Sequence, residues 1–215
     1  MKYSFLLIAA FSLTILSGCT KETRVERADI ESVEGVLLVD GEKLTGVAYD
    51  TYTNKTLRSE YEIVDGLEHG TSTTYFPDGK IDEKATWVEG KKDGPYEKYY
   101  ENGQLAVKGA FAEGKRDGAF ETYYESGLVN KKGFYDNDML TGTVQDFYED
   151  GTLKTSVTYN ENLKDGPYEE YYNSGQIRVF GYFKRDRRDG TFEIYSEDGK
   201  LKQKMVYQNG RAIQN

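Results

Sequence analysis

The most constraining feature of this sequence is a glycine that recurs every 24 residues through most of the chain. A fixed period of this length is typical of repeat proteins, in which each repeat packs mainly against its two neighbours. Such a protein presents an extended surface more often than a single deep pocket. The seven glycines at this spacing are Gly46, Gly70, Gly94, Gly118, Gly142, Gly166 and Gly190.

The amino-acid composition favours one sheet coated with aromatic rings over a thick two-layer core. Only 37% of the 215 residues are hydrophobic, whereas 14% are aromatic and 19 are tyrosines. Tyrosine has an apolar ring and a polar tip, so it can cover a sheet that stays partly exposed. The formal net charge of −9 argues against nucleic acid as a partner, because proteins that bind phosphate backbones carry clustered cations.

The first 32 residues are predicted to export and tether the chain. Lys2 precedes an apolar run, residues 5–16, which is too short to span a bilayer and has the length of a signal-peptide core. We therefore assign residues 1–18 to a signal peptide. Residues 19–32 are polar and carry charges of both signs, and we assign them to a lipidated tether.

The apolar run ends in Leu16-Ser17-Gly18-Cys19, which resembles the bacterial lipobox. The resemblance implies cleavage before Cys19, the only cysteine of the chain, and a multiply acylated N-terminus that anchors the protein stably in a membrane. Thr20 stands where an inner-membrane lipoprotein would carry aspartate, so the outer membrane of a Gram-negative bacterium is the expected location. The alternative is an unmodified cysteine in an ordinary signal peptide or a buried anchor.

One repeat, residues 94–117, has the pattern of a β-hairpin. Asn102-Gly103 predicts a two-residue type I′ turn, in which both central residues have positive φ. Aromatic and alternating segments flank this turn, and a second turn is expected at residues 113–117. The dipeptides equivalent to Asn102-Gly103 are Asp78-Gly79, Ser126-Gly127, Asp150-Gly151, Ser174-Gly175 and Asp198-Gly199.

The chain is therefore predicted to be all-β, with an elongated antiparallel meander of seven 24-residue β-hairpin repeats over residues 46–215. Residues 33–45 are assigned to an N-terminal half-repeat cap, in which residues 33–39 form a lone strand ahead of the first repeat. Atypical terminal copies are expected because an open array must limit edge-to-edge growth.

Pairing about the first turn predicts which side chains share a face of the sheet. Tyr100 is expected opposite Leu105, and Tyr96 is expected opposite Gly109. With Phe111, these residues form the face that we expect to be packed, and the glycine leaves room for a ring to lie across it. The equivalent sets are Phe120, Tyr124, Val129, Gly133 and Tyr135, and Tyr168, Tyr172, Ile177, Gly181 and Phe183.

The opposite face is mostly charged but keeps one aromatic ring in nearly every repeat. In a regular meander these rings stand two strands apart, about 9–10 Å. They are the candidate binding residues, as a repeated platform for a sugar or an extended polypeptide. The alternative is structural, with each ring packed on cross-strand neighbours and lysine stems. The six residues of this ring ladder are Tyr75, Tyr99, Tyr123, Phe147, Tyr171 and Tyr195.

The repeat unit resembles the MORN repeat variant, in segments such as Asp93–Leu105 (DGPYEKYYENGQL) and Asp189–Leu201 (DGTFEIYSEDGKL). The resemblance covers residues 46 to the C-terminus and implies a hairpin array. Bacterial members are often labelled YwqK-like antitoxins, and eukaryotic relatives are thought to serve as protein scaffolds or phosphoinositide-associated modules. An acidic, exported chain fits poorly with a cytoplasmic antitoxin or with binding to anionic lipid headgroups.

The sequence contains no recognisable catalytic, metal or cofactor motif. His69 is the only histidine and lies where other repeats have a turn aspartate, so it is read as a turn residue. Asp136-Asn137-Asp138 resembles the start of a calcium loop, but Met139 and the missing downstream ligands break that pattern. We therefore expect a non-enzymatic outer-membrane lipoprotein that acts as a scaffold for a protein partner, without cofactor. The alternatives are a glycan-binding or cell-envelope-binding module that uses the ring ladder, and an antitoxin-like partner of a toxin.

Overall fold

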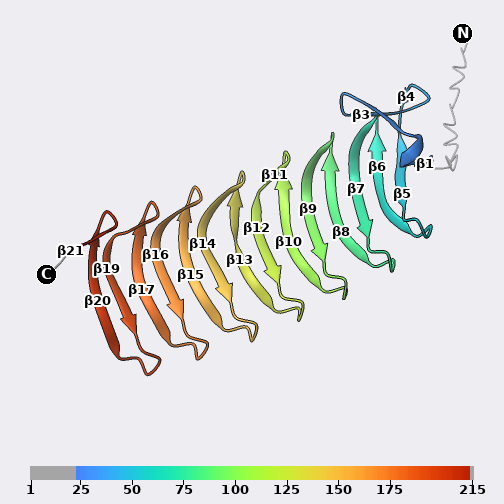
Figure 1. Cartoon of the computed structure of the whole chain (residues 1–215). Helices are drawn as coiled ribbons and strands as arrows, with labels where there is room; N and C mark the ends of the chain where they lie inside the picture. The colour runs from blue at the N-terminus through green and yellow to red at the C-terminus, as the bar shows by residue number, and fades with distance from the viewer. Residues whose placement is uncertain (1–22, 214–215) are drawn as a thin grey trace, which may run out of the picture.

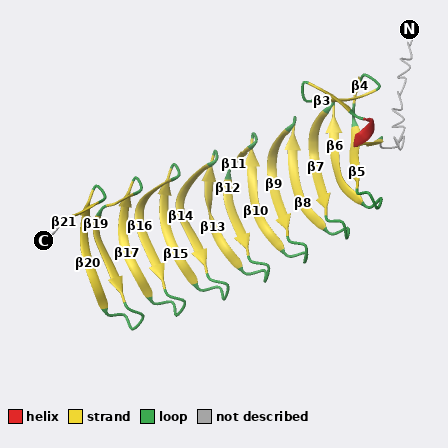
Figure 2. Cartoon of the chain, in the orientation of Figure 1, coloured by secondary structure: helices red, strands yellow, loops and turns green. Residues whose placement is uncertain are grey.

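The computed structural model describes residues 23–213, which form one long antiparallel sheet together with a small sheet at its N-terminal end (Figures 1 and 2). Consecutive hairpins lie side by side along one direction, so the predicted elongated meander is confirmed (Figure 1). In the described part of the chain the seven hairpins are β5 (Gly46–Thr51) with β6 (Leu57–Val64), β7 (Leu67–Tyr75) with β8 (Ile81–Val88), β9 (Lys91–Tyr99) with β10 (Leu105–Ala112), β12 (Gly118–Tyr123) with β13 (Val129–Asp136), β14 (Met139–Phe147) with β15 (Leu153–Asn160), β16 (Leu163–Tyr171) with β17 (Ile177–Lys184), and β19 (Gly190–Tyr195) with β20 (Leu201–Gln208).

Four short strands complete the sheet, of which β1 is described with the N-terminal segment below. The two-residue strands β11 (Lys115–Arg116) and β18 (Arg187–Arg188) pair with the ends of β10 and β17 and lead into β12 and β19. At the C-terminal edge, β21 (Arg211–Ile213) pairs antiparallel with the end of β20.

The two kinds of turn differ from the prediction. At Asn102-Gly103 only the glycine has positive φ, and the N–H of Gly103 donates to the Tyr100 carbonyl at 2.8 Å. This geometry is typical of a type I turn followed by a glycine bulge, so the predicted type I′ turn is wrong there. The type I′ signature lies instead at the other turn, where Glu113 and Gly114 have φ of 50° and 83°.

A one-residue bulge recurs beside the glycine turn of each repeat and changes the register. Tyr99, not Tyr100, pairs with Leu105, and the register shifts between Leu105 and Val107. The expected pairing of Tyr100 with Leu105 is therefore wrong. Beyond the bulge, Tyr96 pairs with Gly109 as expected.

The two faces of the sheet can now be defined. Tyr96, Gly109 and Phe111, with their equivalents in other repeats, form what we call the aromatic face. Its rings meet edge to face, as between Tyr96 and Phe111, whose centroids are 5.4 Å apart. The same contact recurs between Tyr168 and Phe183 at 5.4 Å, between Phe183 and Phe192 at 5.5 Å and between Phe192 and Tyr207 at 5.3 Å. The residues on the other side, which we call the ladder face, include Glu97 and Tyr99.

The N-terminal segment is folded where the sequence suggested a tether. β1 (Arg24–Glu26) pairs in parallel with β5, and the 3-10 helix η1 (Arg27–Asp29) follows it. The assignment of residues 19–32 to a tether is therefore wrong from Arg24 onward. The segment is folded because Val25 and Ile30 pack against the core residues described in the next paragraph.

The cap is a separate sheet and not a half-repeat. β2 (Glu31–Val33), β3 (Val36–Val39) and β4 (Glu42–Lys43) form a three-stranded antiparallel sheet. It bonds to the turn that follows the first hairpin, where the Leu37 N–H donates to the Gly66 carbonyl at 2.8 Å. Leu44, Ala48 and Ile63 are buried beneath it, with at most 4% of each residue exposed. The cap therefore gives the N-terminal end of the array a small hydrophobic core.

Candidate binding surfaces on the two faces of the sheet

The structure places the six ring-ladder residues at equivalent positions. Each one is the last residue of the first strand of its hairpin, beside the bulge, and each is half-buried. They are Tyr75, Tyr99, Tyr123, Phe147, Tyr171 and Tyr195. The 24-residue period therefore produces a spatial period, although the rings themselves are not freely exposed.

The hydroxyls of the ladder tyrosines are hydrogen-bonded to carboxylates. Tyr99 donates to Glu97 at 2.6 Å, and Tyr171 donates to Glu169 at 2.8 Å. The hydrogen bond to Glu97, with burial and the nearby charge, raises the pKa of Tyr99 to about 12. For Tyr171 burial is the larger cause, and its pKa also rises to about 12. Tyr123 and Tyr195 likewise donate to Glu121 and Glu193, two residues earlier in the same strand, whereas Tyr75 donates to Glu60 on the neighbouring strand.

The backbone of the ladder residues is also bonded from the neighbouring repeat. The Tyr100 hydroxyl donates to the Tyr123 carbonyl at 2.6 Å, and the partners are 23 residues apart. We call this bond a tyrosine clasp, because it joins one hairpin to the next. The sequence reasoning missed it, although the tyrosines involved follow the 24-residue period. The other clasps run from Tyr52 to Tyr75, from Tyr124 to Phe147, from Tyr148 to Tyr171 and from Tyr172 to Tyr195.

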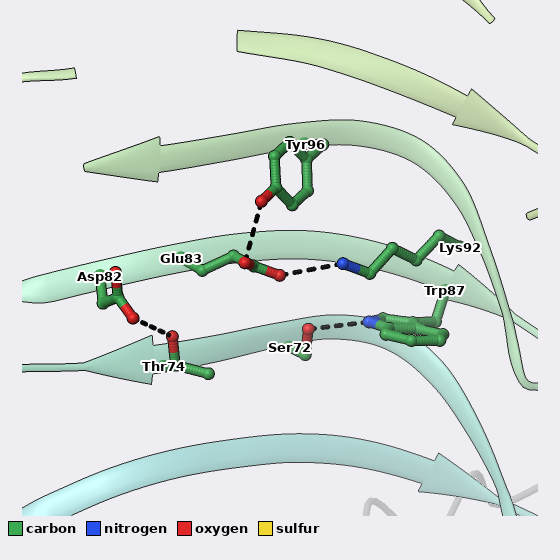
Figure 3. Close-up of polar contacts among 7 residues, drawn as sticks. All are labelled: Ser72, Thr74, Asp82, Glu83, Trp87, Lys92 and Tyr96. Atoms are coloured by element: carbon green, nitrogen blue, oxygen red, sulfur yellow. Dashed lines mark hydrogen bonds and ion pairs between the residues drawn. The ribbon is translucent and has the colours of Figure 1, made fainter. Parts of the chain in front are cut away.

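A polar network crosses the aromatic face between β7, β8 and β9 (Figure 3). Glu83 accepts from the Tyr96 hydroxyl at 2.9 Å and pairs with the Lys92 ammonium at 2.9 Å. Burial and the bond to Glu83 raise the pKa of Tyr96, so its hydroxyl stays protonated. In the same region the indole N–H of Trp87 donates to the Ser72 hydroxyl at 2.8 Å. The bond to Glu83 holds the Tyr96 ring toward β8.

Cations stand over the rings of the aromatic face. Arg116 lies 4.2 Å from the centroid of the Tyr135 ring, and Lys92 lies 4.7 Å from that of Tyr96. Lys164 and Arg188 make similar contacts further along the array. The face therefore combines aromatic surface with positive charge, although the chain as a whole is acidic.

A hollow of about 290 Å³ opens on the aromatic face at the third and fourth hairpins. Its lining is mostly apolar and includes Tyr96, Val107, Gly109, Phe111 and Phe120. Arg116 and Lys131 also line it. The sequence analysis did not identify this hollow, because it depends on the directions in which neighbouring rings turn.

The described residues show no arrangement suited to metal binding, since no group of three or more His, Cys, Asp or Glu among them could hold an ion. The broken calcium motif instead forms a turn, in which Asp138 pairs with Arg116 at 2.8 Å. His69 lies exposed within β7, so its reading as a turn residue is wrong.

The predicted lipidation site, Cys19, and the predicted signal peptide fall outside residues 23–213. Within that range, no helix has the length and apolarity needed to cross a bilayer.

Fold and surfaces together define a class of protein, the open array of β-hairpin repeats. Comparison with family models identifies the class more closely, because the model described as "MORN repeat variant" matches residues 68–89, 92–112, 116–137, 140–161, 164–184 and 188–209. The chain belongs to this family. The first hairpin lies outside the match but has the same strands and the same bulge. Among curated proteins, comparison finds no match to this chain.

Proposed function

We propose that this protein is a lipid-anchored, non-enzymatic scaffold that binds another protein in the cell envelope. The observation that carries the proposal is the open sheet of repeats, which presents two long faces with different chemistry. Membership of the MORN repeat variant family is compatible with such a scaffold. The lipobox-like segment that ends at Cys19 supports the anchor, and Thr20 after it supports the location in the outer membrane.

The folded N-terminus makes the anchor short. β1 begins at Arg24, which is five residues after Cys19 (24 − 19 = 5). An extended chain spans at most about 3.3–3.6 Å per residue, so the link is about 17–18 Å long at most. A lipid on Cys19 would therefore hold the capped end of the array close to the membrane surface, whereas the C-terminal hairpins would lie further along the sheet.

The anchor is tested by substitution of the acylated residue. Growth with a labelled fatty acid is expected to label the native protein and to leave Cys19→Ala unlabelled. The native protein is also expected to sediment with outer membranes after fractionation. Equal labelling of both proteins, or no labelling of either, would remove the anchor from the proposal.

The scaffold is tested on intact cells with a photo-crosslinking residue. Val107 on the aromatic face and Gln145 on the ladder face are suitable positions because they lie on opposite sides of the sheet. We expect a discrete crosslinked protein partner from at least one position. Absence of any partner from both, with the protein folded and exported, would contradict the scaffold.

A second candidate function is glycan binding by the ladder face. It is favoured by the recurrence of a half-buried ring bonded to a carboxylate, as at Tyr99 with Glu97. Replacement of Tyr99, Tyr123 and Tyr171 by alanine is expected to abolish retention on a glycan column while the β-sheet circular dichroism persists. Unchanged retention would exclude the ladder as the glycan site.

A further inference from the structure

The hollow on the aromatic face exists because two neighbouring rings turn away from each other. Tyr96 turns toward β8, where its hydroxyl is bonded to Glu83. Phe120 turns the other way and lies across Gly133, with ring atoms 2.8 and 3.1 Å from where a Cβ at Gly133 would stand. Gly109 lies between the two rings, and neither ring covers it.

The other glycines at the same position of the repeat are covered. The Phe192 ring lies within 2.4–2.6 Å of a Cβ built on Gly181, and Phe120 covers Gly133 in the same way. For Gly109 the nearest atoms are the Phe120 Cβ at 3.7 Å and a backbone oxygen at 4.0 Å. The hollow at Gly109 is therefore open space, whereas each equivalent glycine already receives a ring from this chain.

The size of the hollow selects its occupant. Pockets for small molecules usually measure about 300–1,000 Å³, so a hollow of about 290 Å³ is at the low end of that range. It has room for one aromatic ring between the ring pair Tyr96–Phe111 and the ring pair Phe120–Tyr135. Aromatic side chains inserted into such pockets are the usual anchors of protein interfaces.

Positive charge surrounds the hollow. Lys98 pairs with Val107, which lines the hollow, and it is exposed without an ion pair among residues 23–213. Arg116 and Lys131 also line the hollow and form partly exposed pairs with Asp138 and Asp146 at 2.8 and 3.0 Å. Ion pairs that remain in contact with solvent contribute little free energy, so a carboxylate from a partner can replace either aspartate.

We propose that the hollow over Gly109 is a docking pocket for one aromatic side chain, carried by an acidic extended segment of a partner protein. The proposal deepens the scaffold function and rests on it. The aromatic ring fills the space between the diverging rings, and the acidic neighbours face Lys98, Arg116 and Lys131. A polypeptide is favoured over a free small ligand because the hollow is one part of a long open face along which a segment can continue.

The proposal is tested by titrating the purified full chain with a labelled, acetylated pentapeptide that carries tryptophan between two pairs of glutamates. We expect it to bind at least tenfold more tightly than the same peptide with alanine at its centre. A peptide with lysines in place of the glutamates is expected to bind more weakly than the acidic one. Equal affinity for all three peptides would overturn the proposal.

Gly109→Leu is the variant that closes the hollow. The backbone at Gly109 does not have positive φ, and the space above it is free, so leucine is tolerated there. We expect the affinity for the tryptophan peptide to fall about 10- to 100-fold, the factor for loss of burial of one large apolar side chain. Ala112→Leu, an exposed change on the same strand, is the control and should leave affinity unchanged. Undiminished binding by a folded Gly109→Leu protein would refute the pocket.

Two further measurements separate this proposal from its alternatives. Lys98→Glu is expected to weaken binding of the acidic peptide about 2- to 5-fold, as for an exposed charge. Indole-3-acetate that binds as tightly as the peptide would overturn the proposal in favour of a small-molecule site. In cells, crosslinks from Gln145 but not from Val107 would refute the pocket and leave the scaffold standing, whereas crosslinks from neither position would contradict the scaffold itself.

Discussion

Two glycines at the same position of the repeat are expected to respond to alanine in opposite directions. Gly181 and Gly109 both lie in the second strand of a hairpin, without positive φ, so backbone conformation does not distinguish them. The surroundings of the two glycines do distinguish them. A Cβ on Gly181 meets the Phe192 ring at 2.4 Å, whereas a Cβ on Gly109 meets nothing closer than 3.7 Å.

The Phe192 ring has little freedom to move aside. It is only 3% exposed and is held edge to face between Phe183 at 5.5 Å and Tyr207 at 5.3 Å. Overpacking of this kind costs about 1–3 kcal/mol, so Gly181→Ala is expected to destabilise the protein by that amount. Gly109→Ala is expected to stabilise it by about 0.4–1 kcal/mol, because alanine restricts the unfolded chain without strain in the folded one.

The comparison is made by urea and thermal unfolding of the two variants beside the native protein. For a chain of this size, 1 kcal/mol shifts the melting temperature by about 2–4 °C. Gly133→Ala provides an intermediate case, since its Cβ would approach Phe120 to 2.8 Å. Equal destabilisation by Gly181→Ala and Gly109→Ala would show that the glycines serve the backbone and not the rings, and would refute the reasoning.

Two further predictions concern the tyrosines. Tyr124→Phe removes the clasp to the Phe147 carbonyl and should lower the free energy of unfolding by about 0.5–1.5 kcal/mol. Phe76→Tyr should raise the free energy of unfolding, because it adds a clasp to the Tyr99 carbonyl. Urea unfolding that ranks the two variants otherwise would contradict the clasp. In alkaline titration by ultraviolet absorbance, Tyr99 and Tyr171 should ionise near pH 12, against about 10 in the unfolded chain. Because the folded-state pKa is the higher one, their contribution to stability is present below pH 10 and is lost as the pH rises through 12. Ionisation of all accessible tyrosines near pH 10, with the fold intact, would contradict these bonds.

The period of the sequence predicted the architecture because it repeats both turns and both strands at fixed positions. Pairing about the Asn102-Gly103 turn correctly predicted that Tyr96 lies opposite Gly109, since the turn sets the register of a hairpin. Turn type was predicted less well, although Asn102-Gly103 has the favoured composition of a type I′ turn. In the structure the Asn102 side chain accepts from the Gln104 N–H at 2.8 Å, which stabilises the right-handed alternative.

The N-terminal segment could not be predicted from its own residues. Residues 24–33 alternate charged and apolar side chains too weakly to indicate strands. β1 forms because its backbone pairs with β5, and the cap forms because Leu37 and Val39 cover the core at Leu44 and Ile63. These are contacts between separate segments, and local propensity does not contain them.

The candidate sites were also predicted only in part from the sequence. The ring ladder was located from the sequence because every repeat supplies its ring at one position. The bonds that occupy its hydroxyls and carbonyls were not predicted, because they depend on side-chain directions. The hollow was not predicted either, since it forms only because the Tyr96 and Phe120 rings point away from each other.

Functional specificity in this array therefore depends on differences between repeats more than on the repeat itself. The backbone repeats with little change, whereas the side chain at the position of Gly109 differs in size between repeats, from the hydrogen of glycine to the ring of tyrosine. The equivalents are Tyr61, Ala85, Gly133, Val157, Gly181 and Met205. Where a ring covers the glycine, as at Gly133 and Gly181, that part of the aromatic face is filled by its own chain. The uncovered Gly109 leaves space between the rings for a foreign side chain, so its replacement by the larger residue of another repeat, as in Gly109→Val or Gly109→Met, is expected to remove the hollow without altering the meander.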